Sequence, residues 1–489
     1  MARFLIELFA AFLFLAAAGL AQQVPIIQTT AGKIQGKAVS NATNAYLNIP
    51  YAQPPVGPLR FLGPRPILTP LTQRNGTAFG NSCIQIAAPT PIYTVESEDC
   101  LYLNVWTSPS ATSRLRPVFI WLYGGGWNSG TASGYFNDLT SWAKAHPEIV
   151  FVSINYRLNF YGYTNSPALS SRDTNAGLRD QRAAVEWVAA NIRAFGGDPT
   201  HIVIGGQSAG AASVAEYLYA YPLLPLIRGA ITMSGQAALA NVPAAGNIPG
   251  LPSQGPNPFP KIASSVGCPL IQNNYAAQLD CVRTKTVAEI TQAISANNVY
   301  GISPFVDNQT LYTTAEYKAR AGAGRFARVP LLTGTTENEA DLFVIDRTTN
   351  TLNQTLSDLI TLGAFRCLDA QQASYSSKKA PTYRYRYMGV FPTLSPSPLR
   401  SWHASDQVVL FNGAPYLPSV AVEYMQQAWS TFIVDPNNGL LSFGWQKYQG
   451  YGTKTLVDIF RNSNDLSHPI QLEDPTSFDA SCGVLGQGL

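Results

Sequence analysis

Charged residues are scarce in this sequence. Lys, Arg, Asp and Glu make up 12% of its 489 residues, the net charge is +3, and no run of basic residues occurs. Nucleic acids and anionic membranes are bound through clusters of Lys and Arg, so the composition gives no sign of either as a partner. We expect the partner to be a small, mostly apolar molecule.

Long apolar segments are missing as well, except at the N-terminus. Met1-Ala2-Arg3 gives a basic start, residues 4–18 form a mostly apolar run, and Gly19-Leu20-Ala21 supplies small residues for cleavage. This pattern predicts a secretory signal peptide over residues 1–21 and a secreted mature chain that begins near residue 22. A transmembrane anchor is the alternative, but the run is short and no second apolar segment of about twenty residues follows it.

Metal-binding patterns are absent too. The sequence has no CxxC and no cluster of His and Cys, so we predict neither a metal site nor a cofactor. Six cysteines fit an exported protein with three disulfide bridges, whose pairing the sequence alone does not fix. The cysteines are Cys83, Cys100, Cys268, Cys281, Cys367 and Cys482. Sequons that could carry glycans occur at Asn41, Asn75, Asn308 and Asn353.

Short buried strands and helices alternate along the chain. Apolar runs at 101–106, 117–123 and 149–154 predict strands, and the spacing of Leu178, Val185, Val188 and Ile192 predicts a helix after them. Such alternation is typical of an α/β protein with a large, mostly parallel sheet covered by helices on both faces.

We interpret two proline-rich segments, 241–260 and 391–400, as surface loops and not as domain linkers. The candidate motifs are scattered over the whole chain, and one catalytic domain needs all of them. We therefore predict a single domain over residues 22–489.

The strongest local signal is a serine between two glycines. In Ile202-Val203-Ile204-Gly205-Gly206-Gln207-Ser208-Ala209-Gly210, a β-branched run leads into G-x-S-x-G, and an alanine-rich helical pattern follows. An ordinary Gly/Ser turn is the alternative, but the strand before and the helix after are the context of a nucleophile elbow. We expect Ser208 to be exposed at a sharp turn, with the N-terminus of the next helix beside it.

A serine nucleophile needs a histidine as its base and an acid that orients the histidine. In hydrolases with this elbow the chain order is Ser, acid, His, which excludes His146 and His201. His468 lies in a polar stretch before a proline and is interpreted as a surface residue. His403, in a loop ahead of an apolar run, is the predicted base.

The acid should follow a strand between Ser208 and His403. Residues 329–334 predict that strand, and the loop after it offers Glu337, Glu339 and Asp341, among which spacing does not choose.

An oxyanion hole is predicted where the strand 119–123 runs into Gly124-Gly125-Gly126-Trp127, because glycines at a strand end let backbone N–H groups face a cavity. A phosphate-binding loop is the rival interpretation, but no Gly-Lys-Ser/Thr follows the glycines.

Over nearly the whole predicted mature chain the sequence resembles the type-B carboxylesterase/lipase family of α/β-hydrolases, which includes carboxylesterases, cholinesterases and fungal lipases. Within this family the sequence most resembles fungal secreted carboxylesterases. The resemblance lies in residues 49–57, 97–105, 123–127, 155–157, 195–199, the elbow and 383–387.

The resemblance implies an α/β-hydrolase fold, and it places the triad acid at Glu339. It places the oxyanion donors on the N–H groups of Gly125, Gly126 and Ala209. It also implies three disulfides, which pair Cys83 with Cys100, Cys268 with Cys281 and Cys367 with Cys482.

Two departures from the family narrow the expected substrate. Gln207 stands where the family usually has Glu, so the site lacks one negative charge that could attract a cation or raise the pKa of the base. The segment from Cys83 to Cys100 is short and has no tryptophan, whereas cholinesterases place a cation-binding indole there and lipases a longer flap. We expect a plain esterase for esters of short to medium acyl chain.

The alternatives are an interfacial lipase, an acyltransferase or lactone-processing enzyme with the same triad, and a non-catalytic adhesion protein. The adhesion protein is disfavoured because Ser208, Glu339 and His403 are all present.

Overall fold

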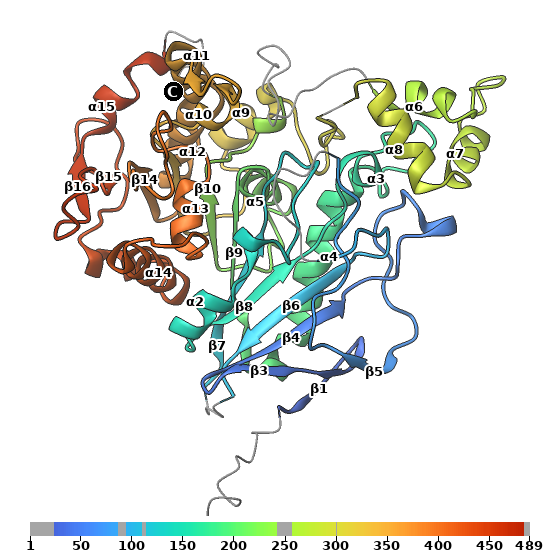
Figure 1. Cartoon of the computed structure of the whole chain (residues 1–489), viewed down its shortest axis with the longest axis horizontal. Coiled ribbons are helices and arrows are strands. Elements are labelled where there is room, and N and C mark those ends of the chain that lie inside the picture. Colours follow the sequence, from blue (N-terminus) through green and yellow to red (C-terminus); the bar gives the residue numbers. More distant parts are fainter. Residues whose placement is uncertain (1–23, 87–93, 110–113, 242–256, 300, 484–489) are drawn as a thin grey trace, which may run out of the picture.

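An eleven-stranded sheet forms the centre of the molecule (Figure 1). The computed structural model describes residues 24–86, 94–109, 114–241, 257–299 and 301–483, so the predicted signal peptide lies outside the described residues. From one edge to the other the strands are β16 (Ile470–Glu473), β15 (Leu456–Ile459), β14 (Thr382–Tyr387), β11 (Leu331–Thr336), β10 (Gly229–Met233), β9 (Gly197–Gln207), β7 (Arg116–Leu122), β8 (Val150–Ile154), β6 (Tyr102–Thr107), β4 (Thr43–Pro50) and β3 (Lys37–Ser40).

The strands from β15 to β8 pair in parallel, while β16 at one edge and β6, β4 and β3 at the other are antiparallel. Two small sheets accompany the large one. The first consists of β1 (Ile26–Thr29), β2 (Gly32–Gln35) and β5 (Leu71–Asn75), and the second of β12 (Ile345–Asp346) and β13 (Thr351–Leu352).

Helices cover both faces of the large sheet, as the sequence predicts. The described helices, not all of which lie on the sheet, are α2 (Thr140–Ala145), α3 (Asn159–Gly162), α4 (Ala176–Asn191), α5 (Ala209–Ala220), α6 (Phe259–Ser265), α7 (Tyr275–Arg283), α8 (Val287–Ala296), α9 (Thr314–Gly322), α10 (Asp341–Val344), α11 (Gln354–Ile360), α12 (Cys367–Ser377), α13 (Ser405–Leu410), α14 (Ser419–Val434) and α15 (Pro475–Phe478). A π-helical turn, η5 (Thr361–Arg366), joins α11 to α12. In Figure 1, α6, α7 and α8 gather at the upper right, away from the strands.

Strand β7 shows how the sequence builds two core layers. Its residues alternate in direction, so that Val118, Ile120 and Leu122 join one buried cluster and Phe119 and Trp121 join another. Helices α4 and α5 pack into the first cluster, and α2, α13 and α14 into the second. From Val118 to Leu122 the strand is buried on both faces and apolar at every position, which explains the continuous apolar run in the sequence.

One strand prediction differs from the structure in its bounds, and one expected loop is only partly described. The chain between β2 and β3, which belong to different sheets, passes close to Tyr46 at Gly36, where a Cβ atom would lie 2.6 Å from the tyrosine ring. The strand expected at 329–334 is β11, which begins only after Pro330. Most of the expected 241–260 loop, residues 242–256, lies outside the described residues, and α6 begins at its end.

Candidate active site

Ser208 lies at the tight turn between β9 and α5. It is the single residue between the last residue of the strand and the first of the helix, with φ 56° and ψ −125°, a conformation that residues other than glycine rarely adopt. Two backbone hydrogen bonds hold it there. The N–H of Ser208 donates to the carbonyl of Met233 at 2.8 Å, and the N–H of Ala212 donates to the carbonyl of Ser208 at 2.9 Å. The turn is thus fixed by β10 on one side and α5 on the other.

The two glycines of the motif make room for this turn. A Cβ atom at Gly210 would lie 2.2 Å from the carbonyl oxygen of Leu122, and one at Gly206 would lie 2.5 Å from the backbone carbon of Gly210. Both distances are far below van der Waals contact. The helix can therefore start directly against β7 only because these positions carry no side chain.

The glycine-rich loop after β7 lies next to the elbow. Gly125 and Gly126 have φ values of 112° and 63°, and a Cβ atom at Gly124 would be 2.9 Å from the Cβ of Ser208. Within the described part of the chain, the N–H groups of Gly125, Gly126 and Ala209 donate to no carbonyl or side chain. Unpaired donors from a glycine turn and from the N-terminus of a helix are suited to an oxyanion.

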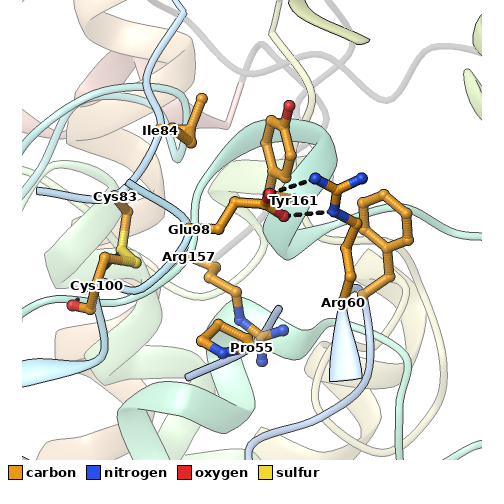
Figure 2. A pocket seen from close by; sticks show the side chains of 9 residues that line it. Pro55, Arg60, Cys83, Ile84, Glu98, Cys100, Arg157 and Tyr161 are labelled. Carbon is orange, nitrogen blue, oxygen red and sulfur yellow. Dashed lines mark hydrogen bonds and ion pairs between the residues drawn. A yellow bond between two sulfur atoms is a disulfide. The ribbon is translucent and has the colours of Figure 1, made fainter. Parts of the chain in front are cut away.

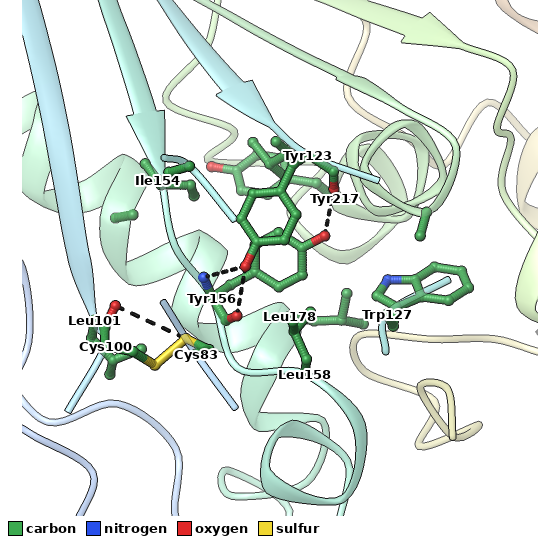
Figure 3. Packing of buried hydrophobic residues seen from close by; sticks show 14 of the residues in the cluster. Cys83, Cys100, Leu101, Tyr123, Trp127, Ile154, Tyr156, Leu158, Leu178 and Tyr217 are labelled. Atoms are coloured by element: carbon green, nitrogen blue, oxygen red, sulfur yellow. Dashed lines mark hydrogen bonds between the residues drawn. A yellow bond between two sulfur atoms is a disulfide. The ribbon is translucent and has the colours of Figure 1, made fainter. Parts of the chain in front are cut away.

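Buried aromatic residues hold this loop in place (Figure 3). Tyr123 and Tyr156 stack with ring centroids 4.4 Å apart, and each hydroxyl donates to the backbone carbonyl of the other. Beyond the glycines, the indole N–H of Trp127 donates to the Ser213 hydroxyl on α5 at 2.9 Å. Both ends of the loop are therefore anchored, the second of them to helix α5.

His403 and Glu339 meet in the buried interior beside the sheet. Glu339 Oε2 lies 2.5 Å from His403 Nδ1, and the N–H of Thr336 donates to Oε1 of the same carboxylate at 2.8 Å. The backbone N–H of His403 also donates to the carbonyl of Glu339 at 3.2 Å. Glu339 is fully buried and His403 is 5% exposed. This arrangement fixes the imidazole with its proton on Nδ1, which leaves the lone pair on Nε2.

The second nitrogen of His403 faces the elbow. Gln207 Nε2 donates to His403 Nε2 at 3.1 Å, and the rings of Phe343 and Phe365 pack beside the imidazole with centroids 5.1 and 5.0 Å away. Ser208 follows Gln207 directly, so this contact brings the turn that carries the predicted nucleophile near the predicted base. No hydrogen bond of the Ser208 hydroxyl is found among the described residues, and in free enzymes such contacts are often longer than in the substrate complex.

The two other carboxylates of the predicted acid loop have different partners. Asp341 is fully buried, accepts from the Ser357 hydroxyl at 2.6 Å, and pairs with the Arg400 guanidinium at 2.7 Å. Glu337 lies 3.5 Å from Arg386 and 3.8 Å from Arg366, and burial raises the pKa of its carboxyl. Of the three, Glu339 is the one that contacts His403.

The remaining histidines also have partners away from His403. His146 Nδ1 is 2.9 Å from Glu148, and His201 Nε2 is 2.9 Å from the carbonyl of Ile433. His468 is exposed, next to Ser467.

A fourth acid near the site has no counterpart in the sequence prediction. Asp406, on the first turn of α13, is fully buried and accepts a hydrogen bond from the Tyr385 hydroxyl at 2.8 Å. Burial, and next the negative charge of Glu339, raise the pKa of Asp406 to about 6. Its position three residues after the predicted base was the only signal that the sequence offered.

The disulfides join the expected pairs, Cys83 to Cys100, Cys268 to Cys281 and Cys367 to Cys482. Around the first of them, Arg60 Nε donates to Glu98 Oε1 at 2.6 Å, and both side chains line a small pocket beside the bridge (Figure 2). The base of the 83–100 segment is therefore firmly held, while residues 87–93 lie outside the described residues.

In the described ranges, no group of three or more His, Cys, Asp or Glu side chains is placed to hold a metal ion, and no helix is long and apolar enough to cross a membrane.

Comparison with a family model identifies the family to which the chain belongs. The model of the Carboxylesterase family matches residues 23–359. The chain belongs to the carboxylesterase family. The fold is accordingly the α/β-hydrolase fold, and this carboxylesterase-family protein is a carboxylic ester hydrolase.

Three relatives illustrate the range of this carboxylesterase family. A chlorogenic acid esterase of Aspergillus niger is 35% identical over 448 residues, which are 85% of this chain and 83% of that protein. A cholinesterase of Mus musculus is 34% identical over 339 residues, 65% of this chain and 54% of the cholinesterase. Secreted lipase 5 of Gibberella zeae is 29% identical over 463 residues, 82% and 83% of the two chains.

Proposed function

We propose that the protein is a secreted serine carboxylesterase that hydrolyses esters of short to medium acyl chain. Ser208 is the nucleophile, His403 the base and Glu339 the orienting acid. The N–H groups of Gly125, Gly126 and Ala209 form the oxyanion hole. The observation that carries this proposal is the 2.5 Å contact between Glu339 and His403, since it leaves Nε2 of the imidazole facing the turn that bears Ser208.

The reaction follows from these positions. His403 Nε2 takes the proton of the Ser208 hydroxyl while the serine oxygen bonds to the ester carbonyl carbon, and the negative charge moves to the carbonyl oxygen. The backbone donors stabilise that charge, and Glu339 stabilises the imidazolium. His403 then gives the proton to the leaving alcohol, which produces the acyl-enzyme, and water repeats the sequence to release the acid.

Labelling with an organophosphate tests the nucleophile. The reagent should add one tag to the peptide that contains Ser208 and abolish activity, and the Ser208→Ala protein should take up no tag. A tag on another serine would refute the assignment.

The substrate class rests on the short 83–100 segment, which leaves little apolar flap to open at an oil surface. The rate with tributyrin should rise smoothly across its solubility limit, with no jump. A sharp upward break there would mean an interfacial lipase, which the similarity to a secreted lipase keeps as the second candidate.

A substrate panel separates the remaining possibilities. p-Nitrophenyl esters from acetyl to palmitoyl should be cleaved best at the short and medium lengths, and a choline ester poorly. Chlorogenic acid belongs in the panel because a relative over most of the chain is an esterase of that name. Transfer of the acyl group to an added alcohol in preference to water would instead indicate an acyltransferase.

The proposal of secretion rests on the N-terminal segment 1–21, on three disulfides and on a relative named as secreted. The four sequon asparagines are exposed, as glycan attachment requires: Asn41, Asn75, Asn308 and Asn353. N-terminal sequencing and glycosidase treatment of protein from the culture medium test these points, and a single cooperative unfolding transition would support the one mature domain proposed for residues 22–489.

A further inference from the structure

The first of the two loop peptides proposed as oxyanion donors is held from behind by its own carbonyl group. The N–H of Gly126 belongs to the same peptide unit as the carbonyl of Gly125. That carbonyl accepts from the N–H of Asn128 at 3.0 Å, from the N–H of Ser129 at 3.1 Å and from the Ser129 hydroxyl at 3.3 Å. Because the C=O and N–H of a trans peptide point in opposite directions, these bonds aim the N–H of Gly126 away from the turn 128–130.

The second donor peptide rests on the same turn. The N–H of Gly125 shares its peptide unit with the carbonyl of Gly124, and a Cβ atom at Gly130 would lie 2.4 Å from that carbonyl oxygen. Gly130, with φ 107°, can pack so closely only because it has no side chain. The turn 128–130 therefore lies behind both donor peptides, and a shift of this turn would redirect both N–H groups.

Residues at the base of the first disulfide loop hold the turn from outside. Gln85 Oε1 accepts from the N–H of Gly130 at 2.8 Å. The N–H of Ile86 donates to the carbonyl of Asn128 at 3.0 Å. A side chain and a backbone group of the 83–100 segment thus bind the two ends of the turn.

Gln85 is itself well fixed. Its side chain is buried, and its backbone N–H donates at 3.0 Å to Oε2 of Glu96, which lies on the returning arm of the same loop. The disulfide between Cys83 and Cys100 closes the loop two residues before Gln85. The amide oxygen is therefore a rigid acceptor for the turn.

We propose that Gln85 is a positioning residue of the oxyanion hole. Its side-chain oxygen fixes Gly130, and through the turn 128–130 it fixes the direction of the Gly125 and Gly126 N–H groups. The base of the 83–100 segment must then stay in place during the reaction, because lifting it would remove this support. This inference rests on the proposed function, in which these N–H groups stabilise the oxyanion, and it favours an esterase that needs no opening at an oil surface.

The test measures the affinity for a trifluoromethyl ketone. The Ser208 oxygen bonds to its carbonyl carbon, the serine proton passes to His403, and the carbonyl oxygen becomes an anion in the hole. Such an adduct reports on the oxyanion donors directly.

Two variants remove the acceptor for the N–H of Gly130. Gln85→Met has no acceptor of this kind, and Gln85→Asn keeps the amide but is one methylene too short. Outright loss of an oxyanion donor costs about 100- to 1000-fold in rate, and misdirection costs a part of that. Both variants should lower kcat/KM for p-nitrophenyl butyrate about five- to twentyfold and raise the Ki of the ketone by the same factor. The midpoint of the pH profile should not move, because Glu339 still holds His403.

Gln278→Met is the matched control. Gln278 is also buried, and its amide donates to the carbonyl of Cys268 beside the second disulfide, on α7. This control should lose stability in thermal unfolding while kcat/KM and the Ki of the ketone stay at their wild-type values.

The outcomes separate the inference from the proposed function. If both Gln85 variants lose stability as the control does and keep the wild-type kcat/KM and Ki, Gln85 is only structural and the inference is wrong. It is equally wrong if kcat/KM falls while the Ki of the ketone does not rise. Wild-type ester hydrolysis by Ser208→Ala would instead overturn the proposed function.

Discussion

Replacing Glu339 by Gln should nearly abolish catalysis without unfolding the protein. The reason lies in the hydrogen bonds of the carboxylate. The N–H of Thr336 donates to Oε1, so in the variant it holds the amide oxygen at that place. The NH₂ group must then face His403 Nδ1, where the carboxylate now lies at 2.5 Å. A donor there forces the ring to carry its proton on Nε2, the nitrogen that has to accept from Ser208.

Two effects set the size of the loss. The imidazolium no longer has a carboxylate beside it, and opposite charges about 4 Å apart attract by about 4 kcal/mol at an effective dielectric constant of about 20. That energy alone corresponds to roughly a thousandfold in rate. The wrong tautomer adds to it, and the equivalent change in a serine protease lowers kcat about 10⁴-fold. We expect kcat to fall between about 10³- and 10⁴-fold, with KM little changed.

The assay is the steady-state hydrolysis of p-nitrophenyl butyrate, with thermal unfolding as a check of the fold. Glu337→Gln is the matched control, because it removes the same charge two residues earlier, where the partners are Arg366 and Arg386. It should retain most of the wild-type kcat. If Glu339→Gln kept more than about a tenth of the activity, or if the control proved the crippled enzyme, our account of the acid would be wrong.

Three further predictions concern other parts of the molecule. Ser208→Ala should lose all ester hydrolysis and keep its melting temperature within about 1 °C, as measured by calorimetry, since only a hydroxyl is lost; residual turnover would point to another nucleophile. His468→Ala should leave the pH profile of kcat/KM unchanged while His403→Ala is inactive, and the reverse result would exchange their roles. Glu216→Met should stabilise the protein by about 1 to 3 kcal/mol in urea unfolding. Glu216 is buried on α5, neither of its carboxylate oxygens has a hydrogen-bond partner among the described residues, and burial raises its pKa well above the usual value. Since the neutral form is the one that folding favours, wild-type stability falls as the pH rises above the ordinary pKa of Glu, and the advantage of Met should grow in the same direction; a less stable variant would show that internal water solvates the carboxylate.

The sequence was sufficient for the fold and for the places where backbone geometry demands particular residues. Only glycine fits at positions 206 and 210 of the elbow. Burial of β7 on both faces requires the unbroken apolar run from Val118 to Leu122. Both features can therefore be recognised from the sequence alone. Residue pattern and family resemblance together pointed to the α/β-hydrolase fold that the chain has.

Contacts between residues far apart in the chain were harder to predict from the sequence. The spacing of the three carboxylates within five residues did not identify the acid that contacts His403. The difference arises from distant arginines: Arg400 pairs with Asp341, and Arg386 lies near Glu337. The contact of Phe365 with His403 was missed because Phe365 lies in a π-helical turn that the helical period does not describe. The hydrogen bond between Gln207 and His403 was not predicted, because it joins residues 196 positions apart in the chain.

That separation has a consequence for how the enzyme forms. The proposed nucleophile and the proposed base lie on parts of the chain that meet only when β9, β10, β11 and β14 stand side by side in that order. Contacts between residues so far apart form late and slowly during folding, because long loops must close before any contact rewards them. Recovery of esterase activity after dilution from denaturant should therefore lag behind recovery of helical circular dichroism. Recovered esterase activity therefore indicates that the central sheet is complete.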